Sequence, residues 1–170
     1  LLTSAAGSRT VTEVNVLTAL KKTAKKPYIA IVSGPKITTK IGILKYLLAN
    51  VDKMCLGGKI ANVFLASKYK WPDGMFSPDE IAVARHLLEE YAPQIILPTD
   101  VVIGNDDGSY TQTVDVSYIP EHVGGVWDIG PKSIAEILTA CSSAATIIWN
   151  GPVGHVEVDA YAEGTKALVN

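Results

Sequence analysis

The segment Thr146-Ile147-Ile148-Trp149-Asn150-Gly151-Pro152-Val153-Gly154 is the strongest indication of the fold. It begins with apolar β-formers, which predict a buried strand that ends at Asn-Gly-Pro. Two further apolar runs end similarly: residues 28–32 lead into Ser33-Gly34-Pro35-Lys36, and residues 53–56 lead into Gly57-Gly58-Lys59. Ligands of open α/β sheets bind at the carboxyl ends of the strands. The three glycine turns therefore predict one shared rim and a cleft suited to phosphate.

Predicted strands alternate with predicted helices along most of the chain. This alternation is typical of a parallel sheet with helices on both faces. A capping box at Ser77-Pro78-Asp79-Glu80 marks the start of one helix. We expect strands at residues 28–32, 53–56, 94–97 and 146–149, and helices at about 37–48, from 60 onward, from 77 to 91, from 133 to 141 and from about 160 onward.

Residues 101–119 have a different pattern. Short extended pieces surround a turn at residues 105–108, and Val114 and Val116 alternate with polar neighbours. This pattern favours an edge strand or a small antiparallel ribbon. The predicted fold class is therefore α/β, a Rossmann-like three-layer α/β/α domain with a mainly parallel sheet and a small antiparallel addition.

The chain of 170 residues is long enough for one domain with a substantial core. Residues 1–26 are expected to form a lead-in segment and a helix, and residues 27–170 the domain itself. The apolar stripe of that first helix would consist of Val14, Leu17 and Leu20.

Composition excludes several classes of protein. Hydrophobic residues make up 48% and charged residues 19%, which is typical of a globular chain. The net charge is −2 and no basic block exceeds Lys25-Lys26, which argues against nucleic-acid or membrane-surface partners. There is no apolar span of membrane length, and Leu1-Leu2-Thr3-Ser4 has no signal-peptide features, so we expect a cytoplasmic protein. Cys55 and Cys141 favour two buried thiols, with a disulfide as the alternative.

Lys36 and Lys40 lie four positions apart at the start of a predicted helix and would share one helical face. The free N–H groups of a helix start favour an anion, and lysine adds a mobile charge suited to phosphate. Neither a Walker A loop nor a G-x-G-x-x-G motif is present. The alternative is that both lysines simply solvate an exposed face.

The Gly57-Gly58 pair lets backbone approach a bulky ligand closely, although it would also suit a tight turn between strand and helix. No His/Cys cluster has metal-ligand spacing, so no metal site is predicted in the protein. His86 and His122 are interpreted as ordinary surface residues.

Short phrases along most of the chain occur in the order found in the phosphoglycerate kinase family. The chain resembles the carboxyl-terminal, nucleotide-binding domain of that family. The matching phrases are Gly34-x-Lys36-Ile37-x-x-Lys40-Ile41-Gly42, Gly57-Gly58 with Ala61 and Phe64, Leu97-Pro98-x-Asp100, Asp128-Ile129-Gly130-Pro131, Trp149-Asn150-Gly151-Pro152-x-Gly154 and Glu163-Gly164-Thr165-Lys166-Ala167.

The resemblance implies ADP or ATP as ligand, with Mg²⁺ carried by the nucleotide. It implies two catalytic residues: Lys36, which contacts nucleotide phosphate, and Lys40, which stabilises the transferring phosphoryl group. The full nucleotide-binding set that it implies is Gly34, Pro35, Lys36, Lys40, Gly57, Gly58, Trp127, Asn150, Pro152, Gly154, His155 and Glu157.

Roles within this set also follow from the resemblance. The Gly57-Gly58 pair would pack along the adenine, and Asn150 would lie near the phosphates. Trp127 would line the purine slot, with a buried core tryptophan as the alternative. Glu157 would accept from the ribose hydroxyls unless it belongs to a plain surface loop. His155 would either stack on the purine or face water.

Three residues depart from the family pattern. Thr39 stands where the family has Asp, between the two lysines. Pro35 removes one backbone N–H that could have faced phosphate. Lys59 follows the glycine pair where a third glycine is usual.

The chain ends at Asn170, before the family's Gly-Gly-Gly-Asp-Thr segment, which supplies the protein's metal-binding Asp. We therefore expect an incomplete domain that is inactive alone. In the family a separate amino-terminal domain binds 3-phosphoglycerate, and the intact enzyme is expected to be a monomer.

The leading hypothesis is a phosphoglycerate kinase, which transfers a phosphoryl group between 1,3-bisphosphoglycerate and ADP to give 3-phosphoglycerate and ATP in glycolysis. One alternative is a non-catalytic interaction or regulatory module on the same fold. A weaker one is another Rossmann-like nucleotide-binding protein.

Overall fold

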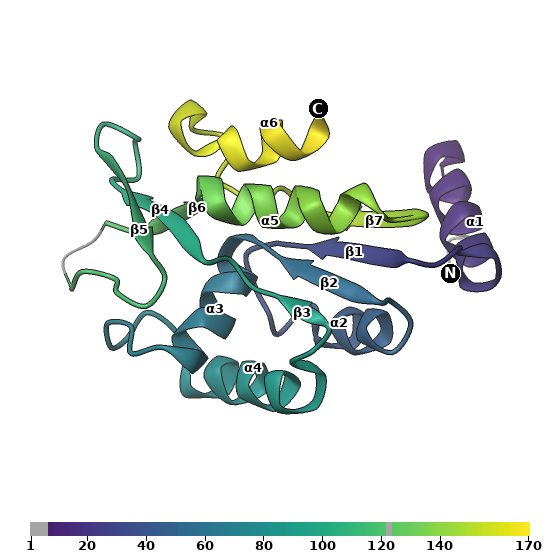
Figure 1. The fold of residues 1–170 in the computed structure, drawn as a ribbon, viewed down its shortest axis with the longest axis horizontal. Coiled ribbons are helices and arrows are strands. Elements are labelled where there is room, and N and C mark those ends of the chain that lie inside the picture. Colours follow the sequence, from purple (N-terminus) through teal and green to yellow (C-terminus); the bar gives the residue numbers. More distant parts are fainter. Residues whose placement is uncertain (1–6, 122–123) are drawn as a thin grey trace, which may run out of the picture.

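The computed structural model of the chain describes residues 7–121 and 124–170 (Figure 1). Helices and strands alternate through most of it. The elements are α1 (Ser8–Thr23), β1 (Tyr28–Val32), α2 (Ile41–Leu48), β2 (Lys53–Leu56), α3 (Gly58–Lys68), α4 (Pro78–Tyr91), β3 (Ile95–Ile96), β4 (Asp100–Gly104), β5 (Thr111–Asp115), β6 (Val126–Ile129), α5 (Pro131–Ser142), β7 (Thr146–Asn150), a 3₁₀ turn (Asp159–Tyr161) and α6 (Glu163–Val169).

The larger sheet has four parallel strands in the order β3-β2-β1-β7. In its centre, Ile31 of β1 lies opposite Cys55 of β2 and Trp149 of β7. Helices α5 and α6 cover one face, and α2, α3 and α4 cover the other (Figure 1). This arrangement confirms the predicted three-layer α/β/α fold.

Strand β1 is a continuous apolar run because both of its faces are covered. All five of its residues are buried. Ala30 and Val32 pack into the core beneath α2 and α3, whereas Ile29 and Ile31 pack into the core beneath α5. Successive side chains of a strand point to opposite faces, so each layer receives alternate residues of the run.

A second, three-stranded antiparallel sheet has the order β5-β4-β6. Its edge strand β5 confirms the ribbon predicted from the alternating valines, although Val116 lies just beyond the strand and is buried. Strand β6 was not predicted. It is only four residues long and is defined by long-range pairing with β4, such as Val101 opposite Ile129.

The start of α2 differs from the sequence prediction. The helix begins at Ile41, with Lys40 as its N-cap, and not at Ile37. Residues 37–40 form a turn in which the Lys40 N–H donates to the Ile37 carbonyl at 2.8 Å. The Ile37 side chain is fully buried in the core, and two β-branched threonines with low helix propensity follow it. The prediction that Lys36 and Lys40 share a helical face was therefore wrong.

The carboxylate of Asp100 joins β4 to the start of α5. Asp100 is 4% exposed. Its Oδ1 accepts from the Ser133 N–H at 2.8 Å and from the Ser133 hydroxyl at 2.7 Å, and its Oδ2 accepts from the Lys132 N–H at 3.1 Å. Helix α5 has no side-chain cap of its own, so a residue distant in sequence satisfies its first N–H groups.

The capping box of α4 is present, with Ser77 accepting from the Glu80 N–H at 3.3 Å. The first helix is present as α1, but the side chains of Val14 and Leu17 lie outside the described residues, as does His122. Cys55 and Cys141 are free thiols; Cys55 is buried and Cys141 half-buried. Within the described ranges, no helix is both long and apolar enough to span a membrane.

Candidate functional site

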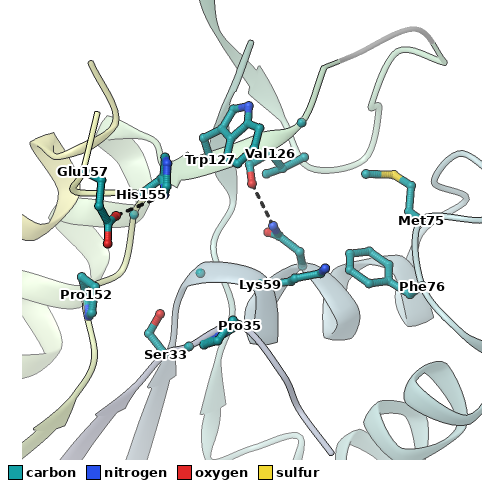
Figure 2. A pocket seen from close by; sticks show the side chains of 15 residues that line it. Ser33, Pro35, Lys59, Met75, Phe76, Val126, Trp127, Pro152, His155 and Glu157 are labelled. Carbon is teal, nitrogen blue, oxygen red and sulfur yellow. Dashed lines mark hydrogen bonds and ion pairs between the residues drawn. The ribbon is translucent and has the colours of Figure 1, made fainter. Parts of the chain in front are cut away.

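A cleft of about 480 Å³ opens at the carboxyl ends of β1, β2 and β7, facing β6 across the gap (Figure 2). The three glycine turns meet there, as predicted. The Ser33 N–H donates to the Asn150 carbonyl at 2.9 Å, and the Gly58 N–H donates to the Val153 carbonyl at 2.9 Å. These two bonds fix the turns to each other and make one continuous rim.

The floor of the cleft is backbone that only glycine can form. Gly58 has a φ of +55°, and a Cβ added there would lie 2.4 Å from the Ser33 hydroxyl oxygen. Gly57 has a different environment. A Cβ there would meet the Val153 side chain at 2.7 Å, so Gly57 packs within the fold and does not line the cleft.

Lys40 and Asn150 do not themselves line the cleft. Lys40 lies at its rim, next to Gly34, which does line it. Its ammonium donates to the Ser33 carbonyl at 2.9 Å and to Oδ1 of Asn150. Both acceptors are uncharged, and no carboxylate of the described residues forms an ion pair with Lys40. The positive charge is therefore held in place without being neutralised.

Lys36 does not lie beside Lys40 at the glycine turns. Its side chain is exposed and does not line the cleft. The pKa of Glu80, at the start of α4, is lowered first by the Ser77 backbone N–H, and also by the charges of Lys59 and Lys36. Lys36 thus lies on the α4 side of the rim.

Trp127 forms the wall opposite the glycine floor. It is half-buried, and its indole N–H donates to the Gly104 carbonyl at 2.9 Å, which fixes the ring. The ring stacks on Tyr161, with centroids 5.8 Å apart, and contacts the His155 ring at 5.3 Å. Nδ1 of His155 lies 3.1 Å from a carboxylate oxygen of Glu157, whose side chain is 72% exposed. Pro35, Pro152 and Gly154 complete the predicted residues that line the cleft.

Several lining residues were not predicted as site residues. They are Ser33, Lys59, Asn62, Met75, Phe76, Gly125 and Val126. Asn62 could have been noticed, because it is the one polar residue in the otherwise apolar segment 60–65. Nothing in the local sequence indicates that Met75 and Phe76 line the cleft, because they lie far from the glycine turns along the chain and reach the cleft only through folding.

Asp128 is a buried carboxylate directly behind the cleft wall. Its oxygens accept from the backbone N–H groups of Ile129 and Gly164, each at 2.8 Å. Burial nevertheless raises its pKa from 3.8 to about 6, because desolvation outweighs the two hydrogen bonds. Within the described residues, no group of three or more His, Cys, Asp or Glu is arranged to hold a metal ion.

The raised pKa of Asp128 predicts a specific dependence of stability on pH. The folded state binds this proton more tightly than the unfolded state, so the stabilisation is present below about pH 4 and is lost as the pH rises through 6. The shift corresponds to roughly 3 kcal/mol. Denaturant unfolding of the wild type and of Asp128→Asn between pH 4 and 7 measures it. The wild type should lose stability relative to the variant over that range, whereas parallel curves would contradict the assignment.

Together, the open and mainly parallel sheet, the helices on both faces and the cleft at the strand ends define an α/β protein with a candidate ligand cleft at the carboxyl edge of the sheet, where ligands of such sheets bind. Comparison with known proteins then identifies the family. The chain belongs to the phosphoglycerate kinase family, whose model matches residues 1–170.

Individual relatives agree with the family match. The phosphoglycerate kinase of Corynebacterium jeikeium is 37% identical over 166 residues, which are 96% of this chain and 41% of that protein. That of Chloroflexus aurantiacus is 39% identical over 150 residues, 85% of this chain and 37% of that protein. The chain thus spans about two fifths of the length of these relatives.

Solved structures show the same correspondence. The phosphoglycerate kinase structure from Coxiella burnetii superposes with a TM-score of 0.86 at 31% identity, over 96% of this chain and 43% of that one. The structure from Pyrococcus horikoshii gives a TM-score of 0.81 at 22% identity, over 94% of this chain and 42% of that one, and supports the fold.

Proposed function

We propose that this chain is the nucleotide-binding part of a phosphoglycerate kinase and that its cleft binds ADP or ATP. In the complete enzyme a phosphoryl group would pass from the carboxyl phosphate of 1,3-bisphosphoglycerate to the terminal phosphate of ADP. One P–O bond breaks, releasing a carboxylate, and one P–O bond forms. The observation that carries this proposal is the unneutralised Lys40 ammonium at the rim of a cleft with a flat aromatic wall.

The residues present fit such a ligand. The Ser33 hydroxyl is fully buried in the cleft lining and has no hydrogen-bond partner among the described residues. A buried hydroxyl without a partner costs stability, and a bound polar ligand would relieve that cost. The bare backbone at Gly58 leaves room for a flat base against Trp127.

Each wall of the cleft would hold one part of the nucleotide. Trp127 and the Gly58 backbone would enclose the base, and the exposed carboxylate of Glu157 would accept hydrogen bonds from the ribose hydroxyls. Lys40 and Asn150 would face the phosphates. When bound with the nucleotide, Mg²⁺ would neutralise phosphate charge. The 3-phosphoglycerate side would come from an amino-terminal domain, as in the family resemblance.

Lys40 would act by charge. Phosphoryl transfer spreads negative charge over the equatorial oxygens, and catalysis consists largely of positioning and electrostatic stabilisation. Thr39, where the family pattern has Asp, donates its hydroxyl to the Lys36 carbonyl at 3.0 Å. It therefore adds no negative charge beside Lys40, whose full positive charge is available to the phosphoryl group.

Replacing Glu157 tests the ribose assignment. In the full-length protein, Glu157→Ala should weaken ADP binding about tenfold, because each ribose hydrogen bond to the carboxylate is lost. Calorimetric titration measures the change. The matched control is Glu89→Ala, which removes an exposed carboxylate of α4 outside the cleft and should leave the affinity for ADP unchanged.

The same titrations separate the alternatives. An enzyme that binds ADP and supports phosphoryl transfer in a coupled assay fits the proposal. Binding without turnover in the full-length protein would favour the non-catalytic module. Absence of adenine-nucleotide binding would overturn the proposal.

A further inference from the structure

The cleft lining includes a buried amide that the proposed function leaves without a role. Asn62 lies near the start of α3 and is only 7% exposed. The neighbouring residues 60, 61 and 63–65 are all apolar and buried. A polar side chain in such a setting is usually fully hydrogen-bonded, because an unpaired buried polar group costs about 1–3 kcal/mol.

Only half of the Asn62 amide has a partner. Its Nδ2 donates to the Val126 carbonyl at 3.1 Å, the dashed line at Val126 in Figure 2. A carbonyl oxygen can only accept, so this contact requires the amide nitrogen and fixes the orientation of the group. Across residues 7–121 and 124–170, nothing donates a hydrogen bond to Oδ1. Asn62 lines the cleft, and its Oδ1 is not among the unpaired atoms that are fully enclosed by protein, so the cleft is where this acceptor can meet a donor.

The position of this amide relates it to the base. Val126, its partner, directly precedes Trp127, whose ring forms the aromatic wall. A base that stacks along that wall would bring its edge toward the amide. An asparagine amide offers an acceptor beside a donor, which matches the 6-amino group and the adjacent ring nitrogen of adenine. Lys59, another polar residue of the cleft lining, is exposed and offers only donors.

We infer that Asn62 is the residue that selects a 6-aminopurine in this cleft, accepting a hydrogen bond from the amino group at Oδ1. The inference rests on the proposed function and adds the choice of base to it. A site whose lining holds an unpaired acceptor discriminates against a ligand that lacks the matching donor, because the acceptor then stays unpaired after the ligand displaces water.

The test compares ADP with purine riboside 5′-diphosphate, which lacks the 6-amino group. Both are titrated calorimetrically into the full-length wild type and into Asn62→Leu. The wild type should bind ADP about tenfold more tightly than the analogue. In Asn62→Leu, ADP affinity should fall about tenfold while the affinity for the analogue changes less than twofold, so the preference disappears. The matched control is Asn50→Leu. It removes a similar hydrogen bond of a side-chain amide outside the cleft, which Asn50 Nδ2 donates to the Tyr46 carbonyl at 2.6 Å. This control should keep the preference.

The outcomes are distinct. Equal binding of the two ligands by the wild type would overturn the inference while leaving the proposed function standing. A preference that survives in Asn62→Leu would overturn it as well, because another residue must then read the base. If neither ligand binds the wild type, the proposed function fails and the inference fails with it. The wild-type comparison needs no variant, so it decides the question even where Asn62→Leu does not fold.

Discussion

Replacing Lys40 with alanine in the full-length protein is expected to lower kcat by about 10²–10³ while KM for the nucleotide changes less than about threefold. The ammonium donates hydrogen bonds to the Ser33 carbonyl and to Asn150, and no carboxylate among residues 7–121 and 124–170 forms an ion pair with it. Its charge therefore matters most when negative charge spreads over the transferring group. Steady-state kinetics in both reaction directions measure the effect.

A second lysine serves as the control for this experiment. Lys45 lies within α2, the helix that Lys40 caps; it is exposed and does not contact the glycine turns at the rim. Lys45→Ala should therefore retain wild-type kcat. If Lys40→Ala also turned over at nearly the wild-type rate, Lys40 would be a solvent-exposed lysine at the rim with no role in catalysis.

Asp100→Ala is expected to lower the free energy of unfolding by about 3 kcal/mol or more, because it leaves buried donors of α5 without an acceptor. The Ser133 N–H and the Lys132 N–H donate to this carboxylate and lose their acceptor, whereas the Ser133 hydroxyl can still donate to the Asp100 backbone carbonyl at 2.8 Å. Chemical denaturation of the two proteins, followed by circular dichroism, measures the difference.

An exposed aspartate with the same local pattern is the matched control. Asp115 accepts from the Ser117 N–H at 2.9 Å and from the Ser117 hydroxyl at 2.7 Å, but at the exposed end of β5. Asp115→Ala should cost about 1 kcal/mol or less, because water replaces the lost acceptor. Equal losses in the two variants would show that burial of Asp100 is not what makes its hydrogen bonds important.

The larger sheet could be predicted because its signals are local. Strand β1 is an unbroken apolar run that ends at Ser33-Gly34, and β7 ends in the same way at Asn150-Gly151. Parallel strands place such ends at one edge, so the shared rim followed directly. Strand β6 could not be predicted, because four residues with an aspartate in the middle become a strand only through distant pairing with β4.

The residues of the site could be predicted less completely than the strands of the larger sheet. The family resemblance pointed to Trp127 and Glu157, and both line the cleft. The prediction of a helix face shared by the two lysines was wrong because residues 37–40 form a turn, in which Ile37 is buried and two threonines of low helix propensity follow it. Ser33 and Asn62 lie in segments that local patterns assign to a turn and to a helix core. Asn62 is the one polar residue of its apolar segment, but that both residues carry an unpaired atom at the cleft is shown only by three-dimensional contacts.

The position of β7 beside β1 has a consequence for how the protein is made. Tyr28 pairs with Thr146, so the centre of the sheet joins segments roughly 120 residues apart, and contacts of such long range form slowly. At about 5–20 residues per second, a ribosome needs roughly 6 to 24 seconds to deliver the second strand after the first. Strands β1 and β2 can pair early, but Asn150 and Pro152 arrive last. The nascent chain therefore cannot assemble its ligand rim until translation has passed residue 154.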